Sequence, residues 1–137
     1  MQKSAKMKKI VESLGKKFDV DLQQSGAHLR LNMPHFDRLV IERLSPTQLS
    51  VAHYFELNGD LCAEPDIVFF IDGDGNFIPY EIQSVVGGYQ VHAELDNGTL
   101  KITNTEKQKD LADFTNTWAE NIKIQGWLED ACKHLSE

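Results

Sequence analysis

Hydrophobic and polar side chains repeat with two different periods along this chain. Between residues 5 and 18, apolar side chains recur every three or four positions and lysines fill the other positions, which is typical of an amphipathic helix with Ser4 as its N-cap. Over residues 27–103 the period is 2, as in strands with one buried face. The helical period then returns, and its predicted inward stripe consists of Leu111, Phe114, Trp118 and Ile122.

Turn residues divide the central region into about seven strands. The clearest hairpin signal is Asp96-Asn97-Gly98, because Asn-Gly tolerates the positive φ angles of a type I′ turn. The segment Asn58–Pro65 lacks alternation and is expected to be a loop. The next segment, Asp66–Asp72, is apolar on both faces, which predicts a strand in the interior of the sheet.

This order of periods predicts an α+β fold. We expect an N-terminal amphipathic helix within residues 1–18, a curved antiparallel meander of about seven strands over 27–103, and a long C-terminal helix over 105–136 that packs on the sheet. Gly126 is expected to kink the last helix. No repeat, linker or shift in composition divides the chain, so we expect residues 1–137 to form a single domain.

Composition narrows the class of protein. The longest apolar run, Ile67–Ile71, is far shorter than the roughly 20 residues of a membrane span, and we expect no contact with membranes. Two cysteines, Cys62 and Cys132, are too few for a disulfide scaffold. With no apolar leader segment at the amino terminus, the sequence predicts a cytoplasmic protein.

Charge is distributed unevenly along the chain. The net charge is −7, but the first 17 residues hold six lysines and one acid, whereas the remaining 120 residues hold 8 basic and 20 acidic side chains. An acidic body repels phosphate backbones, so binding of a nucleic acid is not expected except through the lysine-rich N-terminus. For that segment, a solvated helix face is the simpler interpretation.

Three blocks of sequence resemble a known family. They are His53–Leu61, Glu64–Phe69 and a tail with Phe114, Trp118-Ala119 and Gln125-Gly126. This pattern resembles an uncharacterised bacterial domain family of unknown function that is often carried on mobile elements, and the likeness covers roughly residues 29–129. The resemblance implies a shared fold and a mobile-element setting. It transfers no catalytic residue.

The most patterned of these blocks also contains the candidate binding site. Carboxylates held close together can share a proton or bind a divalent cation, although a solvated loop is the alternative. Trp127 is either an exposed interface anchor or a core residue. The candidate residues are His53, Tyr54, Asn58, Asp60, Glu64, Asp66 and Trp127.

Two metal-site interpretations are weak. His53 and Glu56 lie three positions apart on a predicted strand and point to opposite faces, which favours a neutral core histidine. The segment Asp72–Asn76 has the oxygen spacing of a calcium loop, but Phe77 and Gln83 stand where an EF-hand needs glycine and glutamate. A tight polar turn is the better interpretation, and we expect no metal and no cofactor.

Known catalytic motifs are missing from the sequence. There is no GxSxG, no phosphate-binding glycine loop, no HExxH and no zinc spacing, and we expect no catalytic residues. This favours a non-enzymatic protein-binding or accessory module with an unidentified protein partner. The alternatives are a metal-dependent hydrolase that uses Asn58–Asp66, an acidic DNA-mimic inhibitor and a chaperone-like dimer. The sequence leaves the oligomeric state open.

Overall fold

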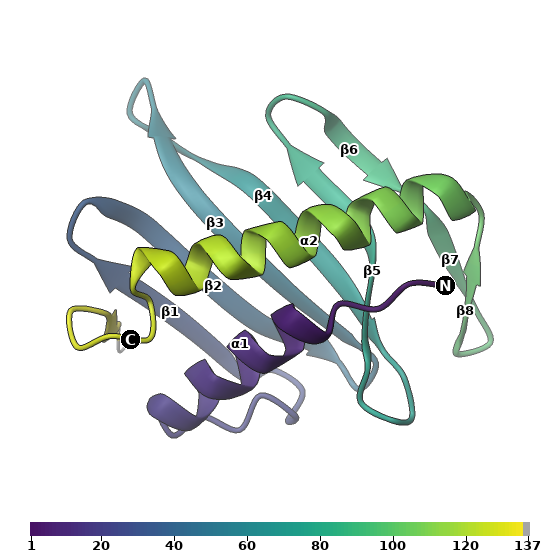
Figure 1. Ribbon diagram of the computed structural model, residues 1–137, viewed down its shortest axis with the longest axis horizontal. Helices are drawn as coiled ribbons and strands as arrows, with labels where there is room; N and C mark the ends of the chain where they lie inside the picture. The colour runs from purple at the N-terminus through teal and green to yellow at the C-terminus, as the bar shows by residue number, and fades with distance from the viewer. Residues whose placement is uncertain (136–137) are drawn as a thin grey trace.

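The computed structural model describes residues 1–135. Two helices lie side by side across one face of a seven-stranded antiparallel sheet, which makes the fold α+β (Figure 1). Within the described chain, neither helix is long and apolar enough to cross a membrane. The elements are α1 (Ala5–Lys17), β1 (His28–Met33), β2 (Phe36–Ser45), β3 (Gln48–Leu57), β4 (Asp60–Ile71), β5 (Phe77–Ser84), β6 (Gly88–Val91), β7 (Ala93–Asp96), β8 (Thr99–Ile102), α2 (Thr105–Gln125) and β9 (Lys133–His134).

The large sheet is a meander extended by one C-terminal strand. Its order is β6-β5-β4-β3-β2-β1-β9, so strands β1 to β6 each pair with their neighbour in the chain. Strand β9 pairs with β1 through Leu31 and His134, and the Leu135 amide donates to the Arg30 carbonyl at 2.8 Å. The apolar segment predicted to lie inside the sheet does so as part of β4.

Both helices bury one stripe against the same face of the sheet. Met7 and Leu14 of α1 and Ile122 of α2 meet Ile67 and Phe69 of β4 in one core. Phe114 was expected in the α2 stripe, and this prediction is wrong because its side chain is 46% exposed. The buried stripe of α2 consists instead of Gln108, Leu111, Ala112, Thr115, Trp118, Ala119 and Ile122.

The N-terminal segment is attached to α2 by buried polar contacts. The Gln2 amide donates to Gln108 Oε1 at 2.9 Å, and Gln108 Nε2 donates to the carbonyls of Gln2 at 2.7 Å and Pro79 at 3.0 Å. Ser4 is the N-cap of α1, as predicted, and its hydroxyl accepts from the Met7 amide and donates to Asn116 Oδ1. These bonds hold the start of α1 against both α2 and β5.

A β-hairpin packs on the other face of the sheet. Residues Tyr89–Leu95 alternate in the sequence as a single strand would, but His92 interrupts them, and the chain leaves the large sheet there to form the hairpin β7–β8. The His92 amide donates to the Tyr80 carbonyl, and its own carbonyl accepts from Thr103. The hairpin covers a second apolar cluster, which contains Val68, Phe70, Ile78, Tyr80, Ala93 and Leu100.

Two predicted boundaries are wrong. The segment from Asn58 to Pro65 is not a loop: Asn58 and Gly59 form a tight turn at positive φ, and β4 begins at Asp60. Its alternation is weak because this end of the hairpin buries neither face fully, and Leu57 is 47% exposed. The C-terminal helix ends at Gln125, since Gly126 is a left-handed cap and not a kink. Strand β9 follows, and position 136 of the predicted helix lies outside the described residues.

Candidate ligand-binding pocket

Two of the residues singled out in the sequence lie in the core under the helices. His53 and Trp127 pack edge to face with ring centroids 5.9 Å apart. Trp127 is fully buried, and its Nε1 donates to Gln125 Oε1 at 3.0 Å. The interpretation of Trp127 as an exposed interface anchor is therefore wrong, because the chain turns back after Gly126 and carries the indole beneath the helices.

The environment of His53 is that of a neutral core histidine. Burial lowers the pKa of His53, while the carbonyl and carboxylate of Asp37 act in the opposite direction. Its Nε2 is buried and has no hydrogen-bond partner among the described residues. A neutral imidazole with an unprotonated Nε2 is the form that this apolar site tolerates best.

Asn58, Asp60 and Glu64 have local structural roles. Asn58 supplies the positive φ of the turn, and Asp60 is exposed where β4 begins. The Glu64 carboxylate accepts hydrogen bonds from Ser84 Oγ and the Val85 amide, each at 2.7 Å. Glu64 thus ties β4 to the end of β5.

Tyr54 and Asp66 lie on the sheet face opposite the helices. Asp66 pairs with Ala52 and Gln83, and its Oδ1 is buried without a partner among the described residues. Burial and the nearby carboxylates of Glu81 and Glu42 raise the pKa of Asp66. Burial and then Asp66 raise the pKa of the Tyr54 phenol. The predicted site is therefore divided between two faces of one sheet, and in the described chain no three His, Cys, Asp or Glu side chains could hold a metal ion.

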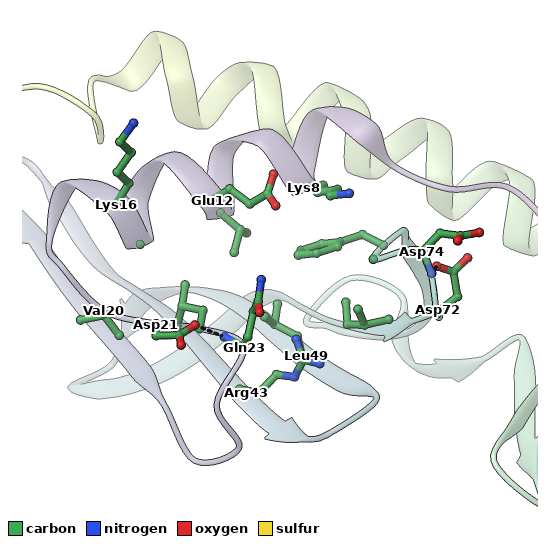
Figure 2. Close-up of a pocket in the computed structure, with 17 residues that line it drawn as sticks. Lys8, Glu12, Lys16, Val20, Asp21, Gln23, Arg43, Leu49, Asp72 and Asp74 are labelled. Atoms are coloured by element: carbon green, nitrogen blue, oxygen red, sulfur yellow. Dashed lines mark hydrogen bonds between the residues drawn. The ribbon is translucent and has the colours of Figure 1, made fainter.

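A cavity of about 620 Å³ opens elsewhere, under α1 (Figure 2). It lies between this helix, the segment that follows it, one end of the sheet and the turn 72–76. Its floor is apolar and consists of Leu22, Leu49, Ile71 and Phe77, and Val11 of α1 adds an apolar side chain above. Its rim carries both signs of charge, from Lys8, Glu12, Lys16, Asp21, Asp72 and Asp74.

Close packing at Gly15 positions one wall of this cavity. The Val20 amide donates to the Gly15 carbonyl at 2.9 Å, and a Cβ atom at Gly15 would lie only 3.0 Å from the Val20 carbonyl oxygen. Any larger side chain would push the segment from Val20 to Leu22 away from the helix. Glycine here thus allows the segment to turn under α1 and bring Asp21 to the cavity.

Arg43 is the unusual residue of this pocket. It belongs to the buried row of β2 with Leu39 and Ile41, and only 8% of its surface is exposed. Its Nε donates to the Ser45 carbonyl at 2.9 Å and its Nη2 to the Pro46 carbonyl. Within residues 1–135, Nη1 has no hydrogen-bond partner and Arg43 forms no ion pair. Burial lowers the pKa of Arg43, which Asp21 opposes.

Sequence reasoning missed Arg43, although a signal for it was present. In the alternating pattern of β2, the buried positions are Leu39, Ile41 and Arg43. A cation at the third position of an otherwise apolar row either needs a buried partner or faces a cavity. A charged residue in an otherwise apolar buried row is therefore a candidate functional residue.

Two acids on the rim are held by their own turns. Asp21 Oδ1 accepts from the Gln23 amide at 3.0 Å, and Oδ2 accepts from Gln24 Nε2 at 3.4 Å. Asp72 Oδ1 accepts from the amides of Asp74 and Asn76, and these bonds, led by Asn76, lower the pKa of Asp72. The turn 72–76 thus adopts the tight polar form predicted for it.

The sequence matches the model of one protein family. A family model described as Domain of unknown function (DUF6908) matches residues 5–128. The chain belongs to the DUF6908 family. Neither the curated proteins nor the solved structures gave a match. All residues that line the cavity, from Lys8 to Phe77, lie inside the part that matches DUF6908.

Proposed function

We propose that this protein is a non-enzymatic binding module that takes its ligand in the cavity under α1. The observation that carries the proposal is the cavity itself, which combines an apolar floor, a charged rim and the unpaired Nη1 of a buried arginine. Ligand sites are usually hollows of about 300–1,000 Å³ with apolar walls and a few polar groups that fix orientation. This pocket has that size and that composition.

The positions of the other candidate residues support binding over hydrolysis. A general base and the groups it serves must come within hydrogen-bond reach of one substrate. His53 lies under the helices, Asp66 lies on the opposite face, and Glu64 is bound to Ser84. A hydrolytic site built on Asn58–Asp66 would need these side chains to converge.

A DNA-mimic role also receives little support from the sheet. The face opposite the helices carries Glu42 and Glu81 together with Arg30 and Arg38 near Tyr54 and Asp66. Imitation of a phosphate backbone needs rows of like charge. Mixed charges suit binding of other partners better.

The wider setting of the proposed module follows from the sequence. We propose a cytoplasmic protein of a bacterial mobile element with a protein partner. The family resemblance supports the mobile-element setting, and the low cysteine content supports the cytoplasm. The lysine-rich N-terminus is the one segment that could attract a nucleic acid.

Fragment screening by amide-detected NMR tests the proposed function. We expect small apolar acids and amides to shift the amides of Leu49, Ile71 and Gly75, and to be recovered unchanged after prolonged incubation. Gln23→Trp should block the mouth and abolish these shifts, because Gln23 is exposed and lines the pocket.

Ser25→Trp is the matched control, since Ser25 is exposed but does not line the pocket. Binding that maps to the opposite sheet face, or that persists unchanged in Gln23→Trp, would contradict the proposal. Chemical conversion of a bound compound would contradict its non-enzymatic part.

A further inference from the structure

We propose that Arg43 binds a carboxylate group of the ligand, an inference that rests on the proposed function of the cavity. The guanidinium reaches the cavity from the sheet side, near Leu49 and below α1 (Figure 2). Two of its nitrogens are held by the Ser45 and Pro46 carbonyls, which fixes its plane. The remaining nitrogen, Nη1, is free for a ligand.

A buried guanidinium with no anion is costly for a folded protein. Charged side chains that leave water are almost always paired, because desolvation of an isolated charge is expensive. Carbonyl oxygens satisfy part of the hydrogen-bonding capacity of Arg43, and Asp21 compensates its charge only in part, without an ion pair. An anionic ligand group at Nη1 would supply the missing charge.

The nearest candidate for an internal counterion is held away from Arg43. Asp21 influences the pKa of Arg43 but forms no ion pair with it. Both oxygens of Asp21 are already engaged, by the Gln23 amide and Gln24 Nε2. The turn after α1 thus keeps Asp21 at the rim and leaves Arg43 to an external group.

The charges around the cavity favour a monoanion. Three cations, Lys8, Lys16 and Arg43, stand among the acids Glu12, Asp21, Asp72 and Asp74. A phosphate dianion would be repelled by four carboxylates, whereas one carboxylate matches the one unpaired charge of Arg43. The apolar floor provides a surface for an aliphatic or aromatic group beside that carboxylate.

Calorimetric titration with N-acetyl-phenylalanine and with its neutral amide tests this inference on the unmodified chain. The two probes share their apolar body and differ at the carboxylate. We expect the acid to bind at least about tenfold more tightly, since a hydrogen bond to a charged group contributes about 1.5–3 kcal/mol. Inorganic phosphate at about pH 8.5, where it is a dianion, should fail to displace the acid.

Variants then assign the preference to Arg43. In Arg43→Gln we expect the ratio of the two affinities to fall to about one, and in Arg43→Lys to an intermediate value, because lysine keeps the charge but not the planar fork. Arg38→Gln is the matched control and should keep the full ratio, since Arg38 does not line the pocket. Amide spectra of each variant establish that it is folded.

The two sources of a carboxylate are separated by a peptide probe. A short peptide with a C-terminal phenylalanine carboxylate, compared with N-acetyl-phenylalanine, distinguishes a polypeptide end from a small acid. Tighter binding of the peptide supports a polypeptide ligand, and equal or weaker binding supports a small acid.

Failure of this inference differs from failure of the proposed function. If acid and amide bind equally and both map to the pocket, the cavity is a binding site but Arg43 does not select a carboxylate. Displacement of the acid by phosphate would contradict the preference for a monoanion. If neither probe nor any fragment maps to the pocket, the proposed function itself is wrong.

Discussion

Two buried polar side chains, Gln108 and Arg43, differ in how far the chain itself satisfies their hydrogen-bonding groups. Gln108 is fully buried between α2 and the N-terminal segment, and its amide group makes three hydrogen bonds to main-chain atoms. Arg43 is almost as buried at the end of β2, but among the described residues its Nη1 forms no hydrogen bond and its charge forms no ion pair.

The contrast separates a structural polar residue from a functional one. A buried amide whose bonds are all made inside the chain stabilises one arrangement of the elements and has nothing left for a ligand. A buried charge that opens into a cavity keeps hydrogen-bonding capacity that a ligand can use. Burial alone therefore does not identify a site, whereas burial with unused bonding capacity does.

The largest expected effect comes from Gln108→Leu. This change leaves the Gln2 amide and the carbonyls of Gln2 and Pro79 without partners, and we expect it to lower the free energy of unfolding by about 2–4 kcal/mol. Urea denaturation measures it. Gln24→Leu, at an exposed position, should change stability by less than about 0.5 kcal/mol. If the two changes lowered the free energy of unfolding equally, the buried hydrogen bonds of Gln108 would not stabilise the fold.

Arg43→Gln should be less damaging. It loses the bonds to the Ser45 and Pro46 carbonyls but also relieves a buried unpaired charge, so we expect a loss of about 1 kcal/mol or less. Thermal denaturation with N-acetyl-phenylalanine separates an effect of Arg43→Gln on ligand binding from its effect on stability. The acid should raise the melting temperature of the unmodified chain more than its neutral amide does, whereas the two probes should raise that of Arg43→Gln equally. A loss as large as that of Gln108→Leu would assign Arg43 a structural role.

Asp66→Asn tests a second buried group with an unpaired atom, outside the cavity. The pKa of Asp66 in the folded chain is raised above its ordinary 3.8. The ionised carboxylate therefore destabilises the fold once the pH exceeds the pKa that Asp66 has in the unfolded chain. Asparagine stays neutral, so we expect the melting temperature at pH 7 to rise by about 2–4 °C.

The gain from Asp66→Asn should disappear as the pH falls toward 3.5, where the carboxyl of the unmodified chain is neutral as well. Melting curves at several pH values measure this dependence. A gain independent of pH would mean that the charge of Asp66 is not its cause.

The smallest effect is expected for Asp21→Asn. This change removes a negative charge near the proposed carboxylate site and keeps an oxygen that can accept from the Gln23 amide, while the bond from Gln24 Nε2 is lost because an amide nitrogen does not accept. We expect N-acetyl-phenylalanine to bind a few times more tightly, because like-charge repulsion near the protein surface is modest. Calorimetric titration would detect it, and weaker binding would mean that Asp21 helps to hold the ligand.

Much of the fold could be predicted from periodicity, since both helices and most strands bury one regular face. The failures occur where burial does not follow the period. The β3–β4 hairpin end exposes Leu57, Tyr89–Leu95 is divided between two sheets at His92, and Gly126 ends a helix whose apolar pattern continues to Trp127. At His92 and Trp127 contacts far along the chain decide the local structure, whereas the exposed end of the β3–β4 hairpin lacks burial on either face.

The candidate site was less predictable than the fold. Acidic residues near Asn58 drew attention because they are close in sequence, but a register shift in the pairing of β3 with β4 and the hydrogen bonds of Glu64 separate them. Arg43 and α1 are far apart in the chain and meet only through the folded core. Only the exception at Arg43 in the apolar row of β2 was visible in the sequence.

The most direct test of the carboxylate site is the NMR signal of the Arg43 Nε–H group during titration with N-acetyl-phenylalanine. The signal can be assigned by its loss in Arg43→Lys. We predict that it shifts progressively with the acid, together with the amides of Leu49 and Ile71, and does not shift with the neutral amide. A signal that stays fixed while the acid binds elsewhere would contradict the assignment of Arg43 as the anion-binding residue.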